Sequence, residues 1–251
     1  MISSSIQASR PLLLVHGLNE TGDIFNDWRR FFPDASLFMP DFPPFGETGS
    51  ISLPDYRMSD YAQWFEGYLV QHGFAEVDWV GHSMGGYIGL EMLRQFPHRI
   101  RKLVLLNSTI EADAPERKDN RNRTIGLLQE RPDTYYREFL GVLFRQGSPW
   151  PHHVKGQKLA QQMRKVPVSA LQQVIAGLRD RPDYTGLAKK NAEKILWLSG
   201  DHDLIFPADQ QKALANALGI SWKNLPNAGH MGPWEDAEHA ARFIREFLLQ
   251  F

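Results

Sequence analysis

The sequence contains no cysteine, which excludes disulfide bonds, thiolate zinc sites and a cysteine nucleophile. It also lacks an excess of either charge, because 28 Lys and Arg residues face 29 Asp and Glu residues and the formal net charge is -1. This balance gives no reason to expect nucleic acid or an anionic membrane as a partner. The spacing of His, Asp and Glu shows no metal motif such as H-E-x-x-H, so we expect no metal.

No stretch approaches the roughly 18 apolar residues of a membrane span. The start of the chain also lacks the pattern of a secretory signal, because Arg10 precedes only a short apolar run at residues 12–15. We therefore expect a cytoplasmic protein without a membrane partner. The length of 251 residues suits one α/β domain with a sizeable core and an inserted subdomain.

Short apolar runs alternate with amphipathic segments along most of the chain. The runs predict buried strands at residues 11–15, 36–41, 77–80, 102–107, 194–199 and 221–225. Between and after them, periodic segments predict helices at 24–32 (capped by Asp23), 58–72, 87–93, 208–218 and 235–251. This alternation predicts an α/β fold with a mostly parallel, doubly wound sheet and helices on both faces.

The alternation stops after Asn107 and resumes near residue 186. The intervening residues predict helices at 114–130, 134–144, 154–165 and 169–179, separated by prolines. We expect residues 108–185 to form a helical lid inserted into a core made of residues 1–107 and 186–251. The basic stretch 117–123 is interleaved with Asp and Asn, which favours a solvated helix face over a binding patch.

A glycine-rich turn joins the strand at 77–80 to the helix that follows it. The turn reads Gly81-His82-Ser83-Met84-Gly85, a G-x-S-x-G pattern between a strand and a helix. A serine at the apex of such a sharp turn exposes its hydroxyl at the top of the sheet. It also sits at a helix N-terminus, where an anion is stabilised. The pattern predicts Ser83 as a nucleophile.

A serine nucleophile needs a histidine base. Among nine histidines, His230 lies in the loop between the last strand and the last helix, at the carboxyl edge of the sheet where ligands bind. His16 is expected to organise its own loop by a hydrogen bond. The side chain of His82 is expected to point away from Ser83, because adjacent side chains at an elbow diverge.

The acid that orients the base should follow another strand at the same edge. Asp201 and Asp203 both follow the strand at 194–199. Asp201 comes directly after Gly200 and is placed to fold the turn, whereas Asp203 can turn back toward the top of the sheet. We therefore favour Asp203.

The order Ser83, Asp203, His230 is the chain order of the α/β-hydrolase fold. The sequence resembles that superfamily over nearly its whole length, and the resemblance rests on Leu14-Val15-His16-Gly17-Leu18, Asp41 with the loop around Gly46, Gly81-His82-Ser83-Met84-Gly85-Gly86, Gly200-Asp201-His202-Asp203 and Ala228-Gly229-His230. It implies a Ser83–His230–Asp203 triad, a lid over the site, and an oxyanion hole from the backbone N–H groups of Leu18 and Met84. A serine at this position argues against haloalkane dehalogenases and epoxide hydrolases, whose nucleophile is an aspartate. The loop at residues 41–48 departs from the D-x-P-G-x-G-x-S pattern usual in the family.

These features predict a serine hydrolase that acts on a small carboxylic ester and needs no cofactor. The same fold and triad also serve hydrolases of carbon–carbon bonds in vinylogous diketones, lactonases, amidases and cofactor-free haloperoxidases. A rival from a different class is a ligand-sensing receptor with slow turnover. In each case the expected partner is a small molecule with an acyl or carbonyl group. Five aromatic residues of the expected lid are predicted chiefly to pack its helices onto the core: Tyr135, Tyr136, Phe139, Phe144 and Trp150.

Overall fold

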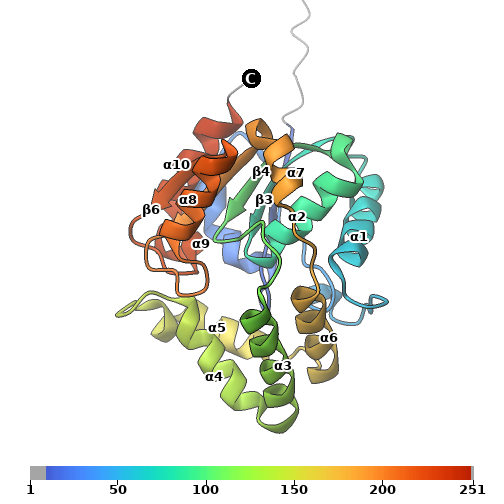
Figure 1. Cartoon of the computed structure of the whole chain (residues 1–251), viewed down its shortest axis with the longest axis vertical. Helices are drawn as coiled ribbons and strands as arrows, with labels where there is room; N and C mark the ends of the chain where they lie inside the picture. The colour runs from blue at the N-terminus through green and yellow to red at the C-terminus, as the bar shows by residue number, and fades with distance from the viewer. Residues whose placement is uncertain (1–9, 250–251) are drawn as a thin grey trace, which may run out of the picture.

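The computed structural model describes residues 10–249, which are built around one six-stranded sheet (Figure 1). Its strands are β1 (Pro11–Val15), β2 (Ser36–Phe38), β3 (Val77–His82), β4 (Ile100–Leu106), β5 (Ile195–Gly200) and β6 (Ser221–Leu225). They pair in the order β2-β1-β3-β4-β5-β6, and every pairing is parallel. Strand β3, near the middle, is buried along its whole length, as expected for a strand covered on both faces. The predicted α/β fold class is confirmed.

Helices cover both faces of this sheet. Outside the β4–β5 connection they are the 3-10 helices η1 (Gly22–Phe31), η2 (Gly46–Thr48) and η3 (Pro97–Arg99) and the α-helices α1 (Met58–Gln71), α2 (Met84–Gln95), α8 (Ala208–Leu218), α9 (Gly232–Glu235) and α10 (Ala237–Leu248). Successive residues of β4 reach opposite faces. Lys102 lies over the ring of Phe247 on α10, whereas Leu103 packs at Gly89 on α2. Helices α2 and α10 therefore lie on opposite faces, and the sheet is doubly wound.

The long connection from β4 to β5 is helical. It contains α3 (Pro115–Glu130), α4 (Pro132–Leu143), η4 (Trp150–His152), α5 (Val154–Met163), α6 (Val168–Arg179), α7 (Thr185–Lys190) and η5 (Ala192–Lys194). Helices α3 to α6 form a separate layer at the bottom of Figure 1, whereas α7 returns to the core. The Tyr184 hydroxyl anchors this return by donating to Glu91 on α2. The four predicted helices are present, and α7 was not predicted.

Two predicted helices differ in detail from those observed. Residues 22–31 form a 3-10 helix that starts after Thr21, so Asp23 lies in its first turn and is not the cap. The Asp23 carboxylate instead pairs with Lys158 on α5. The predicted last helix is divided at Asp236, whose carboxylate accepts from the Asn227 N–H and from the His239 ring. Residues 250–251 of that prediction lie outside the described residues.

The basic stretch at 117–123 is only partly a solvated face. Arg117 and Arg121 both form ion pairs with Asp113, whose side chain is fully buried. Arg117 also lies over the ring of Phe206 and donates to the carbonyl of Ile205. The prediction is wrong for these two arginines, because a carboxylate four residues before the stretch turns one side of α3 inward.

Within residues 10–249, no helix is long and apolar enough to cross a bilayer.

Candidate active site

The turn between β3 and α2 has the geometry of a nucleophile elbow. Ser83 adopts φ 49° and ψ -114°, a left-handed conformation that is strained for a residue with a side chain. The glycines on either side have a steric cause. A Cβ at Gly81 would lie 2.2 Å from the carbonyl oxygen of Gly85, and one at Gly85 would lie 2.3 Å from that of Val15. Only glycine lets the strand and helix approach so closely.

His230 and Asp203 meet at the carboxyl edge of the sheet. His230 Nδ1 lies 2.9 Å from Asp203 Oδ2, and both side chains are buried. The other carboxylate oxygen, Oδ1, accepts the N–H groups of Ile205 and Phe206 at 2.8 and 3.1 Å. Burial alone would raise the pKa of Asp203, but the His230 ring and the hydrogen bonds from Asn107 and Phe206 outweigh it and hold that pKa below its ordinary value. Asp201 is exposed in the turn, where its backbone N–H donates to Leu225.

Ser83 is linked to this pair through the residue before it. The centroid of the His82 ring lies 5.2 Å from that of His230, and His82 Nε2 lies 2.8 Å from the main-chain carbonyl oxygen of His230. Within the described part of the chain, no hydrogen bond joins the Ser83 hydroxyl to the His230 ring. Such bonds are often long without substrate and shorten when it binds. The predicted loop-organising role of His16 agrees with its geometry, because its Nδ1 lies 2.9 Å from the carbonyl oxygen of Gly17.

The two backbone groups predicted to bind an oxyanion lie beside Ser83. Leu18 is in the loop after β1, where a Cβ built on Gly17 would lie 3.0 Å from that of Ser83. Met84 is the first residue of α2. Neither N–H donates to a protein acceptor within residues 10–249. Both N–H groups thus lack a protein partner in this part of the chain, and the dipole of α2 favours an anion at Met84.

Two buried residues at the site were not predicted. Asn107, at the end of β4 with φ 48°, donates through Nδ2 to Asp203 Oδ2 and to the carbonyl of Gly229. The Glu20 carboxylate accepts hydrogen bonds from the His82 ring and from the N–H of Gly17. The position of Asn107 directly after a buried strand was a usable signal. For Glu20 the sequence held none.

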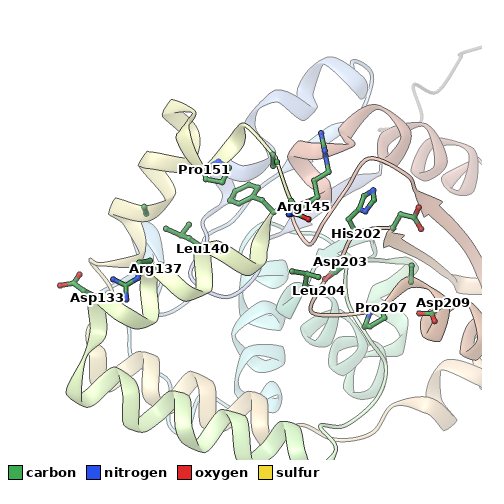
Figure 2. Close-up of a pocket in the computed structure, with 18 of the residues that line it drawn as sticks. Asp133, Arg137, Leu140, Arg145, Pro151, His202, Asp203, Leu204, Pro207 and Asp209 are labelled. Carbon is green, nitrogen blue, oxygen red and sulfur yellow. The ribbon is translucent and has the colours of Figure 1, made fainter.

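A cavity of about 1320 Å³ lies between the helical layer and the loop after β5. Figure 2 shows α4 on one side of it, with Arg137 and Leu140, and the β5 loop on the other, with Asp203 and Leu204. Its lining includes Asp203 but neither Ser83 nor His230. The cavity therefore borders the candidate site on the side of Asp203. Of the five aromatic residues singled out in the sequence, only Phe144 lines it. Within the described residues, no cluster of three or more His, Asp or Glu side chains could hold a metal ion.

Comparison with known proteins agrees with this architecture. Residues 10–237 match the alpha/beta hydrolase fold family. A 2-hydroxymuconate semialdehyde hydrolase of a Pseudomonas species is 26% identical over 97% of this chain and 88% of its own. A 2-hydroxy-6-oxononadienedioate/2-hydroxy-6-oxononatrienedioate hydrolase of Paraburkholderia phymatum is 25% identical over 96% and 86%. The structure of a thermophilic esterase from Thermogutta terrifontis superposes with a TM-score of 0.86 at 28% identity, covering 96% of this chain and 90% of that one. The chain belongs to the alpha/beta hydrolase fold family and is a hydrolase.

Proposed function

We propose that the protein cleaves a small carboxylic ester through an acyl-enzyme on Ser83. The hydrogen bond from His230 Nδ1 to Asp203 Oδ2 carries this proposal. A carboxylate only accepts hydrogen bonds, so the Nδ1 proton stays on the ring and Nε2 is left as the basic nitrogen. This is the tautomer that a general base for a serine hydroxyl needs.

In the first half-reaction, the Ser83 oxygen attacks the ester carbonyl carbon while His230 Nε2 takes the hydroxyl proton. The carbonyl oxygen becomes an oxyanion, which the N–H groups of Leu18 and Met84 stabilise. The intermediate then collapses, the bond to the alkoxy group breaks, and His230 returns its proton to the departing alcohol. Asp203 stabilises the imidazolium formed in between.

In the second half-reaction, His230 takes a proton from water, and the resulting hydroxide attacks the acyl carbon. The Ser83 ester bond breaks, His230 protonates the serine oxygen, and the carboxylic acid leaves. Every proton moves through one ring nitrogen, and no metal or organic cofactor takes part in any step.

We further propose that residues 108–185 act as a lid over this site. Two contacts support the proposal. Asn19, in the loop after β1, donates to the Tyr135 hydroxyl on α4 at 2.7 Å. Arg117 on α3 donates to the carbonyl of Ile205, whose N–H binds Asp203. The helical layer thus touches both the loop of the expected oxyanion hole and the loop of the acid.

Hydrolysis of a carbon–carbon bond next to a carbonyl is the second candidate. It is favoured by relatives that align with nearly the whole chain, among them hydrolases of 2-hydroxymuconate semialdehyde and of 2-hydroxy-6-oxo dienedioates. The ester is preferred because the Thermogutta terrifontis esterase, at 28% identity, is more similar to this chain than these two relatives, at 25 and 26%.

Turnover of two substrate types tests the assignment. We expect release of p-nitrophenol from p-nitrophenyl acetate and butyrate, and loss of that release in Ser83→Ala with the fold retained. Consumption of a 2-hydroxy-6-oxo dienoate can be measured by the loss of its absorbance. A wild-type protein that consumes this compound faster than it cleaves the esters would favour the second candidate. Product release that stops after one equivalent would favour the receptor. Wild-type turnover by purified Ser83→Ala would refute both hydrolase mechanisms.

A further inference from the structure

A buried carboxylate and a buried imidazole lie directly behind the proposed catalytic groups. Glu20 is 1% exposed and His82 is 0% exposed. Glu20 Oε2 lies 2.8 Å from His82 Nδ1, and it also accepts the N–H of Gly17 at 2.6 Å. On the other side of the ring, His82 Nε2 lies 2.8 Å from the main-chain carbonyl oxygen of His230.

Both partners of the His82 ring are therefore oxygen atoms. A backbone carbonyl can only accept, so Nε2 must carry a proton. The carboxylate oxygen already accepts from Gly17, and it accepts from Nδ1 as well when that nitrogen carries the second proton. We propose that His82 is an imidazolium throughout the neutral pH range, neutralised by Glu20, and that this buried ion pair positions the catalytic machinery. This positioning role rests on the function proposed above for Ser83 and His230.

The charges around the ring agree with this state. Burial alone would lower the pKa of His82, but the charge of Glu20 and the hydrogen bonds to Glu20 and to the His230 carbonyl outweigh it and raise that pKa. Asp203, from the loop after β5, raises it further. His16, after β1, also faces this group, and burial lowers its own pKa, which favours its neutral form. His82 thus has two carboxylates near it, Glu20 and Asp203, and both stabilise its protonated form.

The pair joins three segments that are distant in the chain. Gly17 directly precedes Leu18, His82 directly precedes Ser83, and the third contact is to His230 itself. One carboxylate therefore fixes the loop of the expected oxyanion hole against the nucleophile, and one ring fixes the nucleophile against its base. Each contact lies one peptide unit or less from a reacting group.

No neutral side chain can replace Glu20 in this arrangement. The same oxygen, Oε2, accepts from both Gly17 and His82. In Glu20→Gln, an amide oxygen at that place leaves a buried imidazolium without a counter-charge. An amide nitrogen there would suit a neutral His82 but would face the N–H of Gly17, donor against donor. In either case the loop next to Leu18 or the turn next to Ser83 must shift.

Nitrogen NMR of protein labelled with ¹⁵N in its histidines tests the protonation state directly. We expect the His82 ring, assigned by its loss in His82→Gln, to keep two protonated nitrogens at about pH 8, where histidines with ordinary pKa values are neutral. A resonance of an unprotonated ring nitrogen from His82 at pH 7 would overturn the proposal. This result does not depend on the activity of the protein.

Kinetics of matched variants test the positioning role. In Glu20→Gln we expect kcat for p-nitrophenyl butyrate to fall about 10²-fold, the effect of a displacement near 1 Å, with KM changed less than about twofold. Glu20→Asp keeps the charge and should recover much of the loss. The control is Glu91→Gln, because Glu91 is an equally buried carboxylate that binds Arg94 and Tyr184 away from the site. It should lose thermal stability and keep its kcat.

The outcomes separate the two proposals. A Glu20→Gln variant that loses stability as Glu91→Gln does but keeps wild-type kcat would refute the positioning role. If Glu20→Gln does not fold, Glu20→Asp takes its place, and an unchanged kcat with a neutral His82 would refute the proposal equally. A wild-type protein inert toward esters would refute the proposed function, and the NMR result would still decide the state of His82.

Discussion

The substitution Asp203→Asn changes one atom of a carboxylate in which every hydrogen bond is known. Oδ1 accepts the N–H groups of Ile205 and Phe206, and Oδ2 accepts His230 Nδ1 and Asn107 Nδ2. An asparagine keeps its amide oxygen toward the two backbone donors, since these are fixed by the turn. Its NH₂ group then takes the place of Oδ2. That group donates toward His230, which must move its proton to Nε2 so that Nδ1 can accept.

With the proton on Nε2, the ring cannot take the proton of Ser83. We therefore expect kcat to fall by about 10⁴-fold, the loss known for the same substitution in a serine protease, which corresponds to about 5 kcal/mol of transition-state stabilisation. The new NH₂ also opposes the NH₂ of Asn107, so the free energy of unfolding should fall by about 1–3 kcal/mol. A domain of this size should then melt only several degrees lower and remain folded at 25 °C.

The assay is kcat for p-nitrophenyl butyrate, with active sites counted by titration with diethyl p-nitrophenyl phosphate. Asp201→Asn is the matched control, because Asp201 is exposed in the same turn, and its activity should stay within about twofold of the wild type. A folded Asp203→Asn protein that retains more than a tenth of wild-type kcat would refute the role of Asp203 as the orienting acid. The opposite ranking of the two variants would move the acid to Asp201.

Asn107→Ala should lower kcat about 10-fold with little change in KM, because Asp203 loses a donor that fixes its carboxylate. An unchanged kcat would show that the N–H groups of Ile205 and Phe206 are enough to hold the carboxylate in place. Phe144→Ala should change the preference for acyl-chain length, since Phe144 lines the large cavity. Tyr136→Ala should lower the melting temperature and leave the chain-length preference unchanged. An unchanged preference in both variants would make the helical layer a purely structural cover. The pKa values of Glu20 and Asp203 are held below their ordinary values. Their contribution to the free energy of unfolding is therefore complete above about pH 5 and should be lost as the pH drops below about 4. Urea unfolding at several pH values measures this, and Glu20→Gln should weaken the dependence.

Much of the fold could be predicted because its signals are local. A strand covered on both faces is apolar over most of its length, as β4 is from Leu103 to Leu106. The elbow at Ser83 needs glycine at fixed offsets, since Gly81 and Gly85 contact backbone within a few ångströms. Helix α8 was predicted with its observed bounds, because its start after Pro207 and its end at Gly219 are marked by the residues themselves.

What only the tertiary structure decided is the set of partners around buried polar groups. His82 binds Glu20, 62 residues earlier, and the carbonyl of His230, 148 residues later. No local pattern marks such a pair, because a hydrogen bond depends on positions in space and leaves no periodic signal along the chain. The same reason explains the inward-facing Arg117, which pairs with Asp113 and lies over Phe206. The sequence alone determined which segments meet at the carboxyl edge of the sheet, and the packed structure decided which side chains there hold one another in place.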